Sequence, residues 1–215
     1  MTEAGGLGRL PEMMSPEEHR RMAGCEDTLW HYAALHGNVR RALVRAGMLA
    51  EGELLDAGCG TGGLLRRLRG WWPQARVRGV ELSAFAVGLA RERTDCTIDE
   101  GSVLALPCAD ESLDAITCVD VVYQLPDPGA AYREAARCLR PGGVLVVNEP
   151  AHRWLYSYHD VSVGGRQRFA RKELLGLLRA AGLEPVYATN WNFLALPLVW
   201  VRRKLLPAPE GSDVG

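Results

Sequence analysis

The residues best placed to do chemistry lie in the segment 54–63, which reads LLDAGCGTGG. Asp56 stands two residues before the first glycine, where a carboxylate can meet an ammonium group. Glycine lets the backbone turn tightly and approach a ligand closely, and the amides at the start of a following helix favour an electron-rich group. Gly58, Gly60 and Gly63 fit the spacing GxGxxG, which alone is a weak indication of dinucleotide binding. The crowding of glycine suits a cofactor without a pyrophosphate.

A second acid, Glu81, ends the next predicted strand in the segment 79–83. A carboxylate at that place can accept hydrogen bonds from both hydroxyls of a ribose. The alternative is a solvated strand end, which we consider weaker because Glu81 is in register with the glycine loop. In the same way, we prefer Asp56 as a ligand-facing acid to Asp56 as a turn-former.

Two histidines, His152 and His159, follow the fifth predicted strand within the segment 148–160. Imidazole titrates near neutrality, so either could remove a proton from an acceptor and both are our candidate catalytic residues. Asp160 is the sequence neighbour of His159, although adjacent residues need not hydrogen-bond to each other. The open alternative for each histidine is a polar surface loop.

Short apolar strands alternate with amphipathic helices in the middle of the chain. Such alternation predicts right-handed βαβ units, and so an α/β fold: a Rossmann-like, doubly wound, mostly parallel sheet with helices on both faces. Ligands bind at the carboxyl ends of the strands in such sheets, which is where the candidate residues stand. The predicted strands are 53–57, 76–81, 96–99, 114–119, 144–148 and 184–189, and the predicted helices between and after them include 64–72, 130–139 and 171–181.

The front of the chain predicts helices over about 15–24 and 27–46. Trp30, His31 and Tyr32 lie on the second of them. We weigh two interpretations equally: a lid that places aromatic faces over a cofactor, and aromatics packed in the core. We therefore expect an N-terminal helical lid over 1–48, a Rossmann-like domain over 49–206 and a flexible tail over 207–215.

The end of the chain is ambiguous. Residues 191–206 mix aromatic, apolar and basic residues, and fit a returning strand, a substrate wall, a dimer contact or a membrane-surface helix. An uncovered sheet edge would favour self-association, so a homo-oligomer stays open.

Composition excludes several classes of function. The 215 residues carry 25 basic and 26 acidic side chains, a net charge of −1, which is unlike a nucleic-acid-binding protein. The six cysteines form no CxxC pair and no zinc-type cluster with histidine, so we expect reduced thiols, no metal site and a cytoplasmic location. We expect neither a signal peptide nor stable insertion in a membrane, because apolar runs are short.

Five motifs in order resemble class I S-adenosylmethionine-dependent methyltransferases, over about residues 50–190. They are the segments 54–63, 79–83, 101–107, 113–116 and 136–143. The resemblance implies S-adenosylmethionine as cofactor, with the glycine loop at its methionine part, Glu81 at the ribose and Leu82 against adenine. The cofactor-binding set that it implies is Trp30, Tyr32, Asp56, Gly58, Cys59, Gly60, Gly62, Glu81, Leu82, Ser102, Val103 and Val119.

The function that follows is methyl transfer to oxygen, nitrogen or carbon of a small molecule, in bacterial specialised metabolism. One alternative is a nicotinamide-dependent oxidoreductase, although no lysine follows a tyrosine at the Tyr-x-x-x-Lys spacing that such enzymes use. The other is a non-catalytic, cofactor-binding partner protein.

Overall fold

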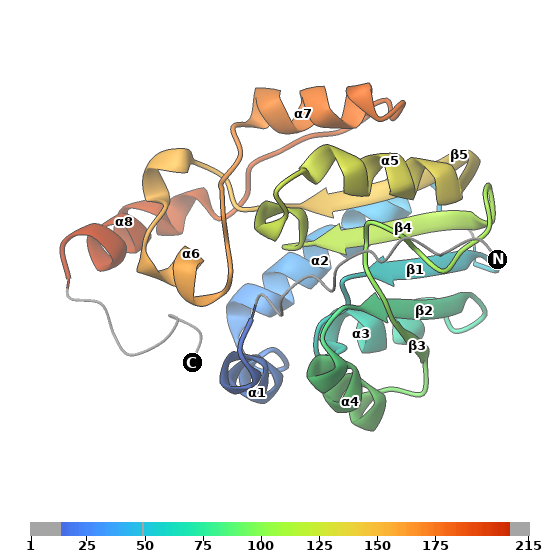
Figure 1. Cartoon of the computed structure of the whole chain (residues 1–215), viewed down its shortest axis with the longest axis horizontal. Helices are drawn as coiled ribbons and strands as arrows, with labels where there is room; N and C mark the ends of the chain where they lie inside the picture. The colour runs from blue at the N-terminus through green and yellow to red at the C-terminus, as the bar shows by residue number, and fades with distance from the viewer. Residues whose placement is uncertain (1–13, 49, 207–215) are drawn as a thin grey trace, which may run out of the picture.

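The centre of the protein is a parallel sheet of five strands in the order β3-β2-β1-β4-β5 (Figure 1). The computed structural model describes residues 14–48 and 50–206. The order reverses between β1 and β4, which is the switch point where doubly wound sheets bind ligands. The strands are β1 (Glu53–Ala57), β2 (Arg76–Glu81), β3 (Thr97–Glu100), β4 (Leu113–Val119) and β5 (Leu139–Asn148).

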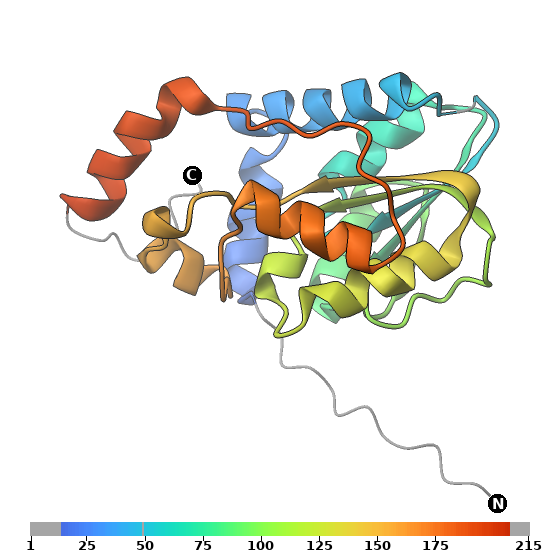
Figure 2. The ribbon, with the colours of Figure 1, turned by 90° about the horizontal axis from the view of Figure 1, so that it is seen from above.

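Helices cover both faces of the sheet, as the sequence pattern predicts. Figure 2 shows α2 and α3 above the sheet and α5 and α7 below it. Leu55, Val80 and Ile116 are fully buried in the core cluster that includes residues of α5. Leu54 of β1 and Leu65 of α3 are fully buried in a second cluster, which includes residues of α2. The helices are α1 (Pro16–Cys25), α2 (Trp30–Arg45), α3 (Gly63–Trp71), α4 (Ala84–Arg93), α5 (Pro128–Cys138), α6 (Tyr158–Ser162), α7 (Arg171–Ala180) and α8 (Leu196–Lys204), with short 3-10 turns η1 (Val122–Gln124), η2 (Arg153–Leu155) and η3 (Phe193–Ala195).

Local sequence explains where most helices begin. The hydroxyl of Ser15 accepts a hydrogen bond from the amide of Glu18 at the start of α1, and Pro16 occupies the first helical position. Ser83 caps α4 by accepting from the amide of Ala86. The Ser83 cap starts α4 directly after Glu81, the acid that ends β2.

Some expected boundaries are wrong. Residues 184–189 form no strand, and β5 is therefore an edge strand within the described part of the chain. β5 also begins at Leu139, five residues before the expected start, because the chain pairs with β4 at Leu113 as soon as α5 ends. Residues 193–204 are helical, which excludes a returning strand there.

The α8 helix has no buried residue, and Leu198 is 74% exposed. None of the helices in residues 14–48 and 50–206 is both long and apolar enough to cross a lipid bilayer. The expected tail over 207–215, and residues 1–13 of the expected N-terminal segment, lie outside the described residues.

Candidate active site

The glycine loop joins β1 to α3 and forms the floor of a cleft at the carboxyl ends of the strands. Its first two amides, those of Gly58 and Cys59, donate hydrogen bonds to the carbonyl oxygen of Val80 at 2.8 and 3.0 Å. Gly58 has φ 79°, and a Cβ there would overlap the side chain of Val121. Only glycine fits this position, so the loop holds its backbone against the base of the cleft.

Glu81 ties the loop to the next strand tip. Its Oε2 accepts a hydrogen bond from the amide of Gly60, and its Oε1 accepts one from the amide of Ser83, both at 2.9 Å. The carboxylate is half-buried and lines the cleft. Since a carboxylate has about four lone-pair sites, Glu81 can also accept from two ligand hydroxyls.

Asp56 lies deeper than its predicted role suggests. It is 2% exposed, and its Oδ1 accepts a hydrogen bond from Oγ1 of Thr117 at 2.6 Å. Burial raises the pKa of Asp56 to about 7, the negative charges of Glu81 and Glu26 add to the rise, and Thr117 opposes it. A cationic group in the cleft would reverse this shift, because it stabilises the ionised carboxylate.

The remaining predicted cofactor residues line the same cleft. Cys59 and Val103 are buried, and burial raises the pKa of the Cys59 thiol, so this cysteine acts as an apolar wall. The Ser102 hydroxyl accepts a hydrogen bond from the amide of Leu104 at 3.1 Å and keeps its own proton to donate. Leu82 and Val119 complete this part of the lining.

The aromatic cluster of α2 lines the cleft instead of entering the core. Trp30 is 61% exposed, and Tyr32 is half-buried with its pKa raised chiefly by burial. The ring of His31 lies 5.1 Å from that of Trp191, with an angle of 34° between their planes. Trp191 precedes α8, so α2 and the segment before α8 are in contact at the cleft.

A buried acid fastens the N-terminal helices to the loop. Glu26, between α1 and α2, accepts a hydrogen bond from Oγ1 of Thr61 at 2.7 Å and forms an ion pair with Arg93. Arg93 also donates to the carbonyl oxygen of Thr61 at 2.9 Å. The helical segment is thereby joined to the loop and to α4.

Both candidate catalytic histidines, His152 and His159, line the cleft. His152 has a left-handed φ of 64°, and its ring lies 5.6 Å from that of Trp154. His159 lies on α6 beside Asp160, whose Oδ1 accepts from Nε of Arg168 at 2.8 Å in a buried ion pair. The carboxylate of Asp160 therefore binds Arg168 and caps the amino end of α6.

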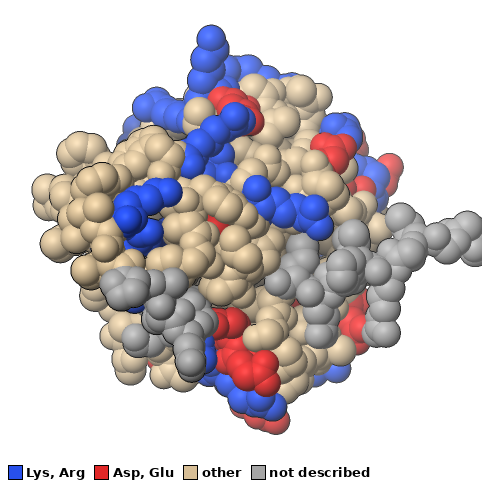
Figure 3. Space-filling view, turned by 60° about the vertical axis from the view of Figure 1, so that its left-hand side comes forward, with Lys and Arg blue, Asp and Glu red and all other residues tan. Residues whose placement is uncertain are grey.

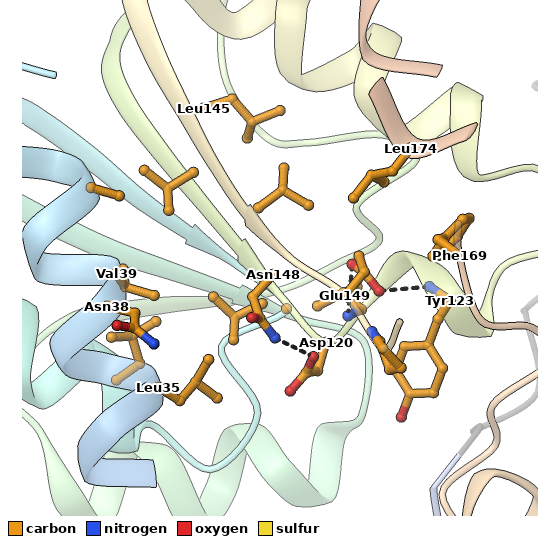
Figure 4. Close-up of a pocket in the computed structure, with 18 of the residues that line it drawn as sticks. Leu35, Asn38, Val39, Asp120, Tyr123, Leu145, Asn148, Glu149, Phe169 and Leu174 are labelled. Atoms are coloured by element: carbon orange, nitrogen blue, oxygen red, sulfur yellow. Dashed lines mark hydrogen bonds between the residues drawn. The ribbon is translucent and has the colours of Figure 1, made fainter. Parts of the chain in front are cut away.

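Sequence reasoning missed a polar group at the tips of β4 and β5 (Figure 4). Asp120 follows β4 directly, with a left-handed φ of 55°. Its Oδ1 accepts a hydrogen bond from Nδ2 of Asn148 at 2.7 Å. Glu149 follows Asn148 and accepts three backbone hydrogen bonds from residues 121–123 at 3.0–3.3 Å. The signal was available, because polar residues directly after buried strands mark this edge of a doubly wound sheet.

Comparison with known proteins identifies the family. A family model described as a methyltransferase domain matches residues 55–147. The chain is 30% identical over 158 residues to a ubiquinone biosynthesis O-methyltransferase of Burkholderia vietnamiensis, a match that covers 64% of this chain and 67% of that protein. The chain belongs to the class I S-adenosylmethionine-dependent methyltransferases.

Other methyltransferases are also similar. A demethylmenaquinone methyltransferase of a Roseiflexus strain is 37% identical over 137 residues, covering 62% of this chain and 56% of that one. The solved complex between the Haloferax volcanii Trm112 methyltransferase activator and a methyltransferase matches with 28% identity and a TM-score of 0.65, covering 79% of this chain and 74% of that chain. The chain spans between 29% and 56% of the first four curated relatives.

The site fits the cofactor of this methyltransferase family. The glycine loop has no room for a side chain at Gly58, so a ligand can approach its backbone closely. The carboxylate of Glu81 has lone pairs left to accept from a ribose diol, and the buried carboxyl of Asp56 suits an ammonium group. Within the described ranges, no group of three or more His, Cys, Asp and Glu side chains is arranged to hold a metal ion.

Proposed function

We propose that this chain transfers the methyl group of S-adenosylmethionine to a small-molecule acceptor. The observation that carries the proposal is the carboxylate of Glu81, which bridges the amides of Gly60 and Ser83 at the mouth of the glycine loop. Glu81 would hold the ribose and the acid at Asp56 would face the ammonium group. Two relatives, described as a demethylmenaquinone methyltransferase and a ubiquinone biosynthesis O-methyltransferase, support a small-molecule acceptor.

Bound S-adenosylmethionine supplies an activated methyl carbon on a positive sulfur. The residues of this chain hold the acceptor in line and exclude water, and positioning accounts for roughly 7–11 kcal/mol of barrier reduction. The aromatic side chains of His31 and Tyr32 on α2 and of Trp191 before α8 line the cleft and would help to exclude water from it. His152 and His159 line the cleft and stay candidate catalytic residues.

The setting is a proposal as well. Figure 3 shows the face at the carboxyl ends of the strands, where broad uncharged areas separate scattered basic and acidic side chains. A surface of this kind favours a small acceptor over a nucleic acid. All six cysteines are free, which supports a reducing, cytoplasmic location. The chain joins a part that would bind the cofactor to a short part that would bind the acceptor, and this arrangement suits an enzyme of bacterial specialised metabolism.

Calorimetry with S-adenosylmethionine, S-adenosylhomocysteine and NAD tests the cofactor. We expect the two sulfur compounds to bind and NAD not to bind, and the opposite ranking overturns the proposal. Transfer of a labelled methyl group to a panel of phenols, amines and carboxylates tests the reaction. Binding without transfer to any acceptor would favour the non-catalytic alternative.

A further inference from the structure

Three side chains from distant parts of the chain form one hydrogen-bonded row at the cleft. Nε1 of Trp191 donates to Oδ1 of Asn148 at 2.7 Å, and Nδ2 of Asn148 donates to Oδ1 of Asp120 at 2.7 Å. An indole nitrogen can only donate. It therefore fixes the amide oxygen of Asn148 toward Trp191 and the amide nitrogen toward Asp120, which determines the orientation of the carboxylate.

The backbone at Asp120 is also held in a demanding conformation. Its φ of 55° is in the left-handed region that residues other than glycine seldom adopt, and its amide donates to the carbonyl oxygen of Asn148 at 2.8 Å. Such conformations persist where the surrounding structure requires them, often at ligand sites. Here the effect is to turn the carboxylate into the cleft, toward the side that Leu35 of α2 faces (Figure 4).

The surroundings of Asp120 suit a proton acceptor. Burial raises its pKa to about 6, while Asn148 and Arg168 oppose the rise. A base with a pKa near the working pH is ionised at neutrality and still accepts a proton readily. The titratable and charged groups that interact with Asp120 from the neighbouring elements are Tyr32, Cys118, Tyr123, Glu149 and Arg168.

The walls beside this carboxylate are aromatic. The rings of Trp191 and His31 lie 5.1 Å apart with their planes tilted by 34°, and His31 meets Tyr32 edge-on at 5.7 Å. All three line the cleft with Tyr123. Aromatic faces favour flat, apolar partners. Because Trp191 also orients Asn148, the wall that would contact a ring and the acid that would meet its hydroxyl are physically connected.

We propose that Asp120, positioned by Asn148 and Trp191, accepts the proton of a ring hydroxyl, so that the acceptor is a phenol or a similar planar enol. This inference rests on the proposed function. The acceptor O–H bond breaks as its proton moves to the carboxylate of Asp120. The oxygen lone pair forms the bond to the methyl carbon, and the electron pair of the broken carbon–sulfur bond stays on sulfur. Asn148 and Trp191 are positioning residues.

A binding experiment tests the juxtaposition without turnover. The probe is 4-nitrophenol, whose ionised form absorbs visible light, titrated from pH 5 to pH 9 on protein saturated with S-adenosylhomocysteine. We expect the wild type to raise the apparent pKa of the bound phenol by about one unit, because the Asp120 carboxylate accepts from the neutral hydroxyl and repels the phenolate. Asp120→Asn removes that charge and should abolish the rise.

Matched variants separate positioning from general damage. Trp191→Phe keeps a ring but removes the indole donor, so the rise in the apparent pKa of bound 4-nitrophenol should be partly lost. Asp95→Asn changes an exposed acid remote from the cleft and should keep the full shift. Equal apparent pKa values in the wild type and Asp120→Asn overturn the inference. Failure of 4-nitrophenol to bind while S-adenosylhomocysteine binds overturns the acceptor class alone. Failure of S-adenosylhomocysteine itself to bind overturns the proposed function.

A kinetic series gives a second readout. With phenols that are un-ionised at the assay pH, Asp120→Asn should lower the rate of methyl transfer by about 100-fold or more. With 4-nitrophenol at pH 9, which is already ionised, the loss should be below about 10-fold, because no proton has to be accepted. An equal loss for all phenols, or no transfer to any phenol by the wild type, contradicts the assignment.

Discussion

Thr61 donates a hydrogen bond from Oγ1 to Oε1 of Glu26 across 2.7 Å, and both side chains are buried. This bond joins the glycine loop to the N-terminal helices, although Glu26 and Thr61 are 35 positions apart in the sequence. The charge of Glu26 is balanced by Arg93 at the same place. The cofactor loop and the helices over it are therefore held by one buried polar cluster.

Removing the Thr61 hydroxyl should destabilise the fold. Thr61→Val leaves a buried carboxylate with one donor fewer, and the free energy of unfolding should fall by about 1.5–3 kcal/mol, as for hydrogen bonds to charged groups. Urea denaturation measures the change. Thr61→Ser keeps the donor and should lose markedly less stability. If Thr61→Val and the wild type unfold at the same urea concentration, the hydroxyl contributes nothing there.

The acid at Glu81 should determine cofactor affinity. Glu81→Ala removes the acceptor of the Gly60 and Ser83 amides together with the expected ribose contact. We expect S-adenosylhomocysteine to bind more weakly by about 1.5–3 kcal/mol in calorimetry. Glu92→Ala, an exposed acid on α4, is the control and should bind as the wild type does. Unchanged affinity in a folded Glu81→Ala would place the ribose elsewhere.

Cofactor binding should release a proton from Asp56. Its pKa is raised to about 7 in the free protein, so at pH 6 the carboxyl is mostly protonated. An ammonium group beside it stabilises the ionised form, so binding should release about one proton at pH 6 and almost none at pH 8.5. Affinity therefore rises with pH up to about pH 7 and then levels off.

Calorimetry in buffers of different ionisation enthalpy counts these protons. Asp56→Asn should abolish the release, while Asp120→Asn should leave most of it intact. A wild-type binding enthalpy at pH 6 that does not depend on the buffer would show that Asp56 does not change its protonation state.

The loop at Gly58 should tolerate no side chain. Gly58→Ala combines a positive φ of 79° with overlap on Val121, so we expect a loss of about 1–3 kcal/mol in stability and a clear loss of S-adenosylhomocysteine binding. Gly88→Ala is the matched control, since Gly88 is exposed on α4 and an added Cβ would contact nothing. That change should stabilise the protein by about 0.5–1 kcal/mol. Thermal unfolding of both variants makes the comparison, and similar melting temperatures would contradict it.

Local patterns in the sequence were sufficient for the sheet and the cofactor half of the site. β1 and β2 have the predicted bounds, because each is marked by residues next to one another in the chain: β1 is a short, mostly apolar segment before the glycine loop, and β2 ends in Glu81 just before the helix cap Ser83. The sequence was insufficient at residues 184–189, whose strand-like composition forms no strand. Strand formation needs a paired neighbour, and sequence composition does not report whether one is present.

The sequence by itself determined the parallel layering, the glycine loop and Glu81, since each depends on residues close together in the chain. Tertiary structure alone decided that Trp191, Asn148 and Asp120 form one row, and that Glu26 meets Thr61. These bonds join residues 28 to 43 positions apart, and their geometry depends on how strands and helices pack. A hydrogen bond requires a donor and an acceptor within about 3 Å, and only the folded chain provides that proximity.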